Sequence, residues 1–317
     1  MTTLAPVRHS LAEAASPLIE QVRAAMPDMA FEDLTRDRLR GIARDNGIDW
    51  GTALLYDSIR RAEWNREFLE RIDSHESPTA MSGGTEVLVA PGALYREQPR
   101  FGADGRAVRA AAQDLGMSCR VIDVASMGSV TGNAEIIAQE LERESRPVIL
   151  ASLSKGGSDV RIALERHPHI AGKIHCWLNF CGLIRGTPIS DSLLGTRWWQ
   201  RGILRGYLAY TRAHRDFVSE LAATADSLLG QPMNADVART VRIINVVAFP
   251  LTAHLSRNSA ARHARLAVYG PNDGTALLCD EIVEPGFIYP VWGADHFMQA
   301  PSLAEIMRRL LQTGEAA

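Results

Sequence analysis

The feature that most constrains the fold is an alternation of short apolar runs and amphipathic stretches that begins after about residue 84. The apolar runs span residues 87–90, 119–124, 148–153, 174–180, 266–269 and 287–291, and stretches with helical spacing lie between them, including 103–115, 134–144 and 157–165. Such alternation is typical of parallel strands joined by crossover helices. Several runs lack polar alternation, which indicates strands buried on both faces. The sequence therefore predicts an α/β fold with a doubly wound, mostly parallel sheet.

The first stretch, up to about residue 73, has a helical pattern throughout. We expect one helix to begin at Asp49, whose carboxylate can accept hydrogen bonds from the first-turn amides. Apolar residues then recur at helical spacing, namely Leu55, Ile59, Ala62, Leu69 and Ile72. Residues 73–84 form a linker by composition. We therefore predict an N-terminal helical extension over 1–80 and an α/β domain over 81–317. The extension could pack under the sheet, extend a lid or form a dimer contact.

The alternation breaks between about residues 191 and 242, where we expect a helical insert. Aromatic residues are frequent in it: Trp198, Trp199, Tyr207, Tyr210 and Phe217. Two interpretations stay open, a lid over a pocket and aromatic packing of the insert against the sheet. The apolar run 243–249 that follows is either another strand or the return from the lid.

The composition excludes several classes of function. The 317 residues carry a formal net charge of -3, whereas nucleic-acid binders usually present a basic face. We find no P-loop and no Gly-x-Gly-x-x-Gly after a strand, which argues against a Rossmann dehydrogenase. No segment is apolar enough to span a bilayer, and the N-terminus lacks the pattern of a signal peptide. The four cysteines match no zinc or disulfide spacing. We therefore expect a soluble cytoplasmic protein, and homo-oligomerisation stays open.

The most informative motif is Ser152-Leu153-Ser154-Lys155-Gly156, which follows the expected strand 148–153 and precedes a helix. This small-x-Ser-x-Gly pattern is that of a nucleophile elbow, in which the backbones on either side of the serine nearly touch. The sharp turn presents the Ser154 hydroxyl, and the Lys155 amide at the helix N-terminus can donate to a developing oxyanion. A serine-rich turn without chemistry is the alternative, but the strand–turn–helix context favours a nucleophile.

A serine nucleophile needs a histidine base held by a carboxylate, and in this kind of fold the chain order is Ser, acid, His. His296 lies just after the last expected strand, where the base belongs. The remaining histidines fall too early in this order or outside the predicted sheet: His9, His75, His167, His169, His175, His214, His254 and His263. We therefore predict His296 as the base.

The predicted acid is Asp273, in the turn-forming sequence Gly270-Pro271-Asn272-Asp273-Gly274. It follows the expected strand 266–269, and the carboxyl ends of parallel strands are where α/β sites are built. An ordinary Asn-Asp-Gly turn is the alternative interpretation. The rival acids are Asp280, Glu281 and Asp295. Adjacent residues rarely face each other, so Asp295 is expected to orient the histidine loop.

A second oxyanion donor is expected from the loop after the first strand, residues 90–96. Gly92 allows the backbone to approach closely there. The donor is the amide of Ala93 or of Leu94, and we choose Ala93.

Taken together, residues 87–298 resemble the α/β-hydrolase superfamily, and within it the bacterial lipases and esterases. Three motifs carry the resemblance: Asn179-Phe180-Cys181-Gly182-Leu183-Ile184-Arg185-Gly186-Thr187-Pro188, Asn272-Asp273-Gly274 and Gly293-Ala294-Asp295-His296-Phe297. They are similar to the loop before the lid, the acid turn and the histidine loop of those enzymes.

This resemblance implies a triad of Ser154 as nucleophile, Asp273 as acid and His296 as base, with neither metal nor organic cofactor. The sequence departs from the family pattern in two places. Pro91-Gly92 replaces the usual His-Gly, and Ser152 stands where the elbow usually begins with glycine.

The predicted activity is hydrolysis of a small-molecule carboxylic ester or thioester through an acyl-enzyme. Acyl transfer or peptide-bond cleavage by the same triad is an alternative, because pocket shape selects the acceptor. A further alternative is a non-catalytic module of this fold that binds a ligand or a partner. That alternative predicts a broken triad, whereas all three positions are occupied here.

Overall fold

The computed structural model describes residues 17–73, 85–195, 213–255, 257–298 and 303–315. Its centre is a parallel sheet with the strand order β2-β1-β3-β4-β5-β6. The strands are β1 (Val87–Ala90), β2 (Cys119–Val121), β3 (Val148–Leu153), β4 (Ile174–Phe180), β5 (Ile243–Phe249) and β6 (Phe287–Trp292). The chain goes from β1 to β2 on one side and crosses back to β3 on the other. The prediction of a doubly wound parallel sheet is therefore confirmed.

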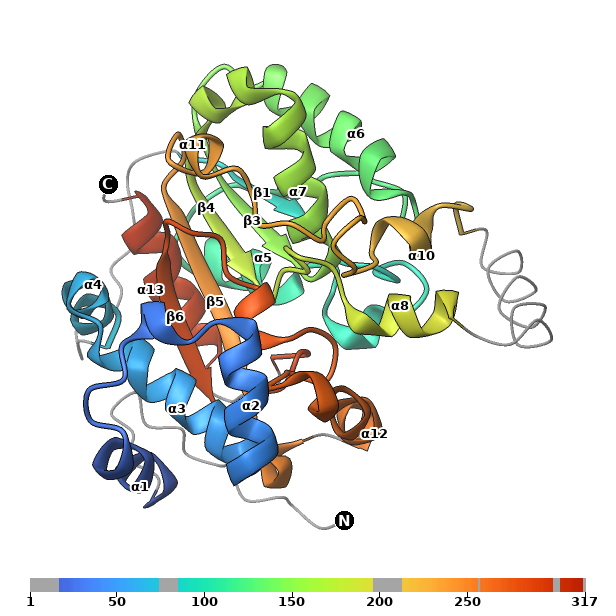
Figure 1. Cartoon of the computed structure of the whole chain (residues 1–317). Helices are drawn as coiled ribbons and strands as arrows, with labels where there is room; N and C mark the ends of the chain where they lie inside the picture. The colour runs from blue at the N-terminus through green and yellow to red at the C-terminus, as the bar shows by residue number, and fades with distance from the viewer. Residues whose placement is uncertain (1–16, 74–84, 196–212, 256, 299–302, 316–317) are drawn as a thin grey trace, which may run out of the picture.

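Helices cover both faces of this sheet (Figure 1). On one face, α6 (Val130–Glu142) and α7 (Lys155–Arg166) pack on the side chains of Leu88, Leu150 and Trp177. On the other face, α5 (Arg106–Asp114) and α13 (Leu303–Glu315) pack on Ile149 and Leu178. The residues of β1 and β5 are buried throughout. Burial on both faces explains why the sequences of these strands are continuous apolar runs.

The N-terminal helices form a further layer at the β6 edge of the sheet (Figure 1). They are α1 (Pro17–Ala25), α2 (Arg36–Asn46), α3 (Ile48–Arg61) and α4 (Glu63–Asp73). Buried apolar residues of α1, α2 and α3 share a core with Val247, Phe249 and Ile288 of the sheet. Of the roles left open by the sequence, this arrangement supports packing against the sheet.

Two details of the N-terminal prediction are wrong. The helix begins at Ile48 with Gly47 as its cap residue, and the Asp49 carboxylate instead accepts from the Thr252 amide and hydroxyl at 2.8 and 2.9 Å. The single expected helix is also divided in two at Ala62, which has an extended ψ of 121°. The division lets fully buried Asn65 exchange two hydrogen bonds with the backbone of Ile288. Both corrections arise from tertiary partners that local spacing does not reveal.

The expected strand at 266–269 is also wrong. These residues end α12 (Arg257–Leu266) and form the short 3₁₀ helix Ala267–Tyr269. Val268 and Tyr269 are 64% and 40% exposed, so the run does not enter the sheet. A four-residue apolar run does not distinguish a strand from a helix end. The fifth strand is instead 243–249, one of the two alternatives for that run.

Part of the expected insert is described. It contains α8 (Pro188–Leu194), α10 (Phe217–Glu220) and α11 (Ala235–Ala238), and α8 and α10 lie side by side (Figure 1). Phe217 packs on the core beneath α6 and α7. Trp198, Trp199, Tyr207 and Tyr210 lie outside the described residues, so the lid stays a prediction. All four cysteines are free. Throughout the described ranges, helices fall short of the length and apolar character that crossing a membrane requires.

Candidate functional site

Ser154 occupies a strained turn between β3 and α7. Its φ and ψ are 51° and -119°, a conformation that non-glycine residues rarely adopt. The turn is fixed because the Ser154 amide donates to the Phe180 carbonyl at 2.9 Å, and the Ser154 carbonyl accepts from Gly157 and Leu183, each at 3.0 Å. The surrounding backbone thus imposes the strain and presents the half-buried Ser154 side chain at the carboxyl end of the strand.

The small residues around Ser154 are required by close backbone contacts. A Cβ atom on Gly156 would lie 2.2 Å from the carbonyl oxygen of Ala90. Ser152 fits the other small position, and its buried hydroxyl accepts from the Trp177 indole at 2.8 Å. The departure from glycine at Ser152 therefore has a local use, since that hydroxyl satisfies a buried donor.

His296 lies in the loop after β6 and contacts both other predicted site residues. Its Nε2 atom is 2.9 Å from the Ser154 Oγ atom, and its Nδ1 atom contacts the Asp273 carboxylate. The neighbouring Phe297 stacks on Phe101 with ring centroids 4.8 Å apart, and its amide donates to the Asp295 carboxylate at 3.1 Å. With the Nδ1 proton donated to Asp273, Nε2 is the free acceptor for the serine hydroxyl.

Asp273 is fully buried in a turn after the 3₁₀ helix rather than after a strand. Its Oδ1 atom accepts from the amides of Thr275 and Ala276, each at 2.8 Å, while Oδ2 faces His296. Burial alone would raise the pKa of Asp273, but the charge of His296 and the hydrogen bonds with His296 and the Ala276 amide hold it below its ordinary value. Asp273 is therefore ionised at neutral pH and can orient the imidazole.

The rival acids lie elsewhere in the same region. Asp280 forms ion pairs with Arg36 and Arg185. Asp295 accepts from the backbone of its own loop, as expected. Glu281 is fully buried beside Asp273, and neither carboxylate oxygen has a well-formed hydrogen bond to a group in the described ranges. Asp273 is therefore the acid that contacts His296.

The two predicted oxyanion donors flank the serine. Lys155 is the first residue of α7, and no described carbonyl or side chain accepts from its amide or from that of Ala93. The Leu94 amide, by contrast, donates to the Ser126 carbonyl at 3.4 Å. The loop lies against the serine, because a Cβ on Gly92 would be 3.3 Å from the Ser154 Cβ. The amides of Lys155 and Ala93 therefore have no hydrogen-bond acceptor among the described groups.

The side chain of Lys155 has a role that the sequence analysis missed. It is buried, and its Nζ atom lies 2.7 and 2.8 Å from the two carboxylate oxygens of Asp159. Asn133 also donates to Asp159, at 2.9 Å. Burial raises the pKa of Asp159 to about 6, against the lowering effect of Lys155. The Lys-x-x-x-Asp spacing, one helical turn apart, was the available signal.

Three described side chains could offer ligand atoms to a metal, since Cys181, Asp273 and His296 place one such atom each within 4.8 Å of one another. Burial raises the pKa of the Cys181 thiol well above its ordinary value, which disfavours the thiolate that a metal binds. Asp273 and His296 already face each other, and His296 faces Ser154. The arrangement therefore fits acid–base chemistry better than metal binding.

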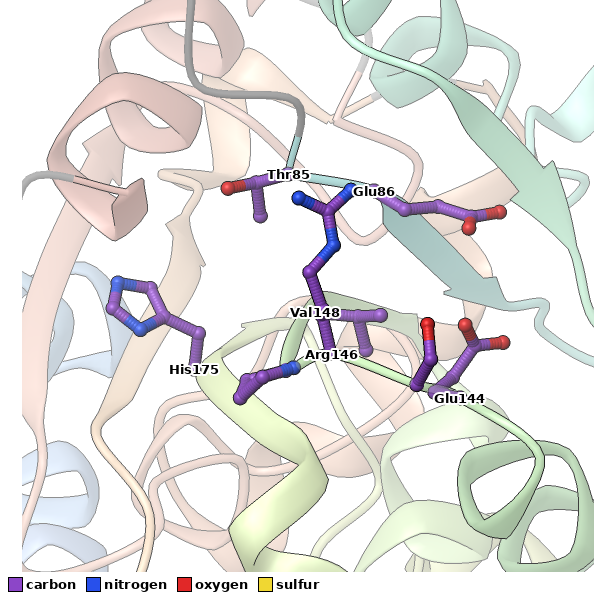
Figure 2. Close-up of a pocket in the computed structure, with 8 residues that line it drawn as sticks. Thr85, Glu86, Glu144, Arg146, Val148 and His175 are labelled. Carbon is purple, nitrogen blue, oxygen red and sulfur yellow. The ribbon is translucent and has the colours of Figure 1, made fainter.

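A separate hollow of about 320 Å³ lies at the opposite end of the sheet (Figure 2). Its lining comes from residues at the amino ends of β1, β3 and β4, namely Thr85, Glu86, Glu144, Ser145, Arg146, Pro147, Val148 and His175. Arg146 points across it toward Thr85 and Glu86 (Figure 2). Because Ser154 follows the carboxyl end of β3, this hollow is not part of the serine site.

Comparisons with known proteins find likeness in structure only. No protein-family model matches the chain, and no curated protein matches it at a significant level. The metagenomic carboxyl esterase MGS0156 is similar with a TM-score of 0.55 and 19% identity, over 75% of this chain and 76% of the esterase. The mature form of Bacillus licheniformis lipase BlEst2 is similar with a TM-score of 0.53 and 17% identity, over 75% of this chain and 92% of the lipase. These likenesses concern the fold.

Proposed function

We propose that this chain, which has the fold of the α/β-hydrolase superfamily, is a serine hydrolase that cleaves a small carboxylic ester or thioester. The observation that carries the proposal is the continuous contact from Ser154 through His296 to Asp273. The strained backbone of Ser154 and the open amides beside it support the same conclusion. A non-catalytic module would have no use for this combination.

The chemistry proceeds in two halves. In the first, Ser154 Oγ attacks the acyl carbon while His296 Nε2 takes the hydroxyl proton, and the amides of Lys155 and Ala93 stabilise the oxyanion. Collapse of the tetrahedral intermediate expels the alcohol or thiol, which receives the proton from His296. In the second half, His296 takes a proton from water as the water oxygen attacks the acyl carbon. The bond to Ser154 Oγ then breaks, His296 returns the proton to the serine, and the carboxylic acid leaves. Asp273 stays ionised and holds the imidazole in the required tautomer.

The comparisons support the choice of bond. MGS0156 is a carboxyl esterase and BlEst2 is a lipase, so both proteins act on esters. The proposal extends that class of substrate to this chain on the basis of its own site. The side chains around Ser154 supply a nucleophile, a base and an acid without a cofactor.

A panel of nitrophenyl esters and acyl thioesters of increasing chain length tests the proposal. Stopped-flow release of about one equivalent of nitrophenol before steady turnover would mark the acyl-enzyme. The Ser154→Ala variant should lose about 10⁴-fold or more in kcat. Ser219→Ala is the matched control, because that exposed hydroxyl donates, among the described groups, to the Asp216 carbonyl alone. Equal hydrolysis by wild type and Ser154→Ala would overturn the proposal.

A further inference from the structure

Glu281 is a buried acidic residue without a place in the mechanism above. It follows the 3₁₀ helix Leu278–Asp280 and is 0% exposed. Its backbone is held on both sides, since its carbonyl accepts from the Asn179 side chain at 2.8 Å and its amide donates to the Leu278 carbonyl at 3.4 Å. The backbone of Glu281 is therefore held by β4 on one side and by the preceding 3₁₀ helix on the other.

A row of buried polar residues in the sheet provides this support. Ser152, Asn179 and Asn245 stand opposite one another on β3, β4 and β5. Asn179 donates to Asn245 at 3.1 Å, and Asn245 exchanges two hydrogen bonds with the backbone of Val283, at 2.9 and 3.0 Å. Buried amides in a sheet are costly unless they are satisfied. Here the amides of Asn179 and Asn245 hold the segment 281–283 against β4 and β5, beside the end of β3 that leads into the Ser154 turn.

The Glu281 carboxyl group faces other acidic groups. Its interacting side chains are the Asp273 carboxylate from the acid turn and the Cys181 thiol after β4, with Asp280 in the preceding turn as a further negative charge. The described residues offer it no ion pair, since Arg36 and Arg185 pair with Asp280 instead. Two ionised carboxylates in this buried environment would repel each other strongly.

A proton on Glu281 resolves this conflict. As a carboxylate, Glu281 has no well-formed donor for either oxygen among the described groups. As a carboxylic acid, it has one O–H group to donate, and the neighbouring Asp273 oxygen can accept it. Burial, and then the charge of Asp273, raise the pKa of Glu281 well above its ordinary value. The same contact contributes to the lowered pKa of Asp273.

We infer that Glu281 is a positioning residue for the triad, a neutral carboxylic acid that donates a hydrogen bond to Asp273 and keeps that carboxylate ionised and aimed at His296. The inference rests on the proposed function. A buried site that holds a carboxylic acid neutral at pH 7, so that it can donate a hydrogen bond, is a known arrangement in proteins. Raising the pH far enough to ionise Glu281 removes the donor and places a second negative charge beside Asp273, so activity falls.

Two variants separate this role from simple packing. Glu281→Gln keeps an N–H donor but does not ionise, whereas Glu281→Leu has a similar volume and no donor. We expect Glu281→Gln to keep kcat within about threefold at neutral pH and to lose the alkaline decline of the wild type. Glu281→Leu should lose about 10- to 100-fold in kcat with little change in KM. Glu284→Gln, in the same segment, is the matched control and should keep the wild-type pH profile.

Infrared difference spectra between wild type and Glu281→Gln provide a readout that does not depend on activity. We expect the carbonyl band of a protonated carboxylic acid in the wild type at neutral pH and its loss in the variant. An enzyme that hydrolyses esters but lacks this band, or whose alkaline limb is unchanged in Glu281→Gln, would overturn the inference alone. A band in a protein whose Ser154 takes no fluorophosphonate would overturn only the proposed function.

Discussion

The side chains of Ser154 and His296 are 142 residues apart in the chain, yet the Oγ atom of one lies 2.9 Å from the Nε2 atom of the other. The parallel sheet produces this proximity, because Ser154 follows β3 and His296 follows β6, and both strands have their carboxyl ends on the same side of the sheet. Asp273 completes the contact from a loop that directly follows the 3₁₀ helix Ala267–Tyr269 instead of a strand. Each of these relationships has a measurable consequence.

Asp273→Asn should lower kcat by about 10⁴-fold with little loss of stability, because an amide at this position favours the wrong imidazole tautomer. The measurement is steady-state hydrolysis of a nitrophenyl ester. Asp236→Asn is the control, since the Asp236 side chain is 92% exposed and pairs with Arg239 at the surface. Retention of activity within tenfold in Asp273→Asn would contradict the assigned role.

Gly156→Ala should destabilise the fold, by about 1–3 kcal/mol or more, because the added methyl group would overlap the Ala90 carbonyl. Urea unfolding followed by circular dichroism measures the change. Gly172→Ala is the matched control, because nothing lies within 4 Å of the Cβ that it would gain. Equal midpoints for the two variants would show that the elbow tolerates a side chain.

Lys155→Met should destabilise the protein by about 3–5 kcal/mol, because it leaves the buried Asp159 carboxylate without its cationic partner. The double variant Lys155→Met/Asp159→Leu should recover most of that loss, since it removes both charges. Denaturant unfolding of the two single variants and the double variant measures the coupling. Additive losses would mean that the two side chains do not depend on each other.

His263 should make the fold sensitive to mild acid. It is buried, its Nε2 atom has no described partner, and burial lowers its pKa below 6.5. Between its folded pKa and 6.5, the unfolded chain takes up a proton that the folded chain does not. The free energy of unfolding is therefore highest above pH 6.5. It decreases as the pH falls from 6.5 through the pKa of His263 in the folded protein.

His263→Phe tests this pH dependence. As the pH is lowered from 7, the unfolding free energy of the wild type should fall relative to that of the variant. His169→Phe is the control, because the His169 ring is exposed. Parallel curves for wild type and His263→Phe would contradict the expectation.

Much of the fold follows from local patterns, and what does not follow depends on contacts distant in sequence. The runs 87–90, 148–153 and 174–180 match β1, β3 and β4 because strands buried on both faces require continuous apolar residues. The run 266–269 is also apolar, but it ends α12 and continues as a 3₁₀ helix. Two of its four residues are exposed, and their exposure depends on tertiary packing that cannot be inferred from so short a run.

The site divides in the same way. An elbow motif and a chain order predict Ser154 and His296, and both residues lie at strand ends. The turn sequence alone indicates Asp273, because the strand expected before it does not exist. The sequence indicates Glu281 only as a rival acid. Its position beside Asp273 depends on buried amides from β4 and β5, which no local pattern relates to it.

The most direct test of the central claim is the intact mass of the protein after exposure to a fluorophosphonate probe. The wild type should gain one adduct, mapped to Ser154 by peptide sequencing, because only an activated serine reacts with such a probe. Ser154→Ala should gain none, whereas Ser219→Ala should react like the wild type. An unmodified wild type, or an adduct of equal yield on Ser154→Ala, would contradict the claim that Ser154, His296 and Asp273 act together as a nucleophilic site.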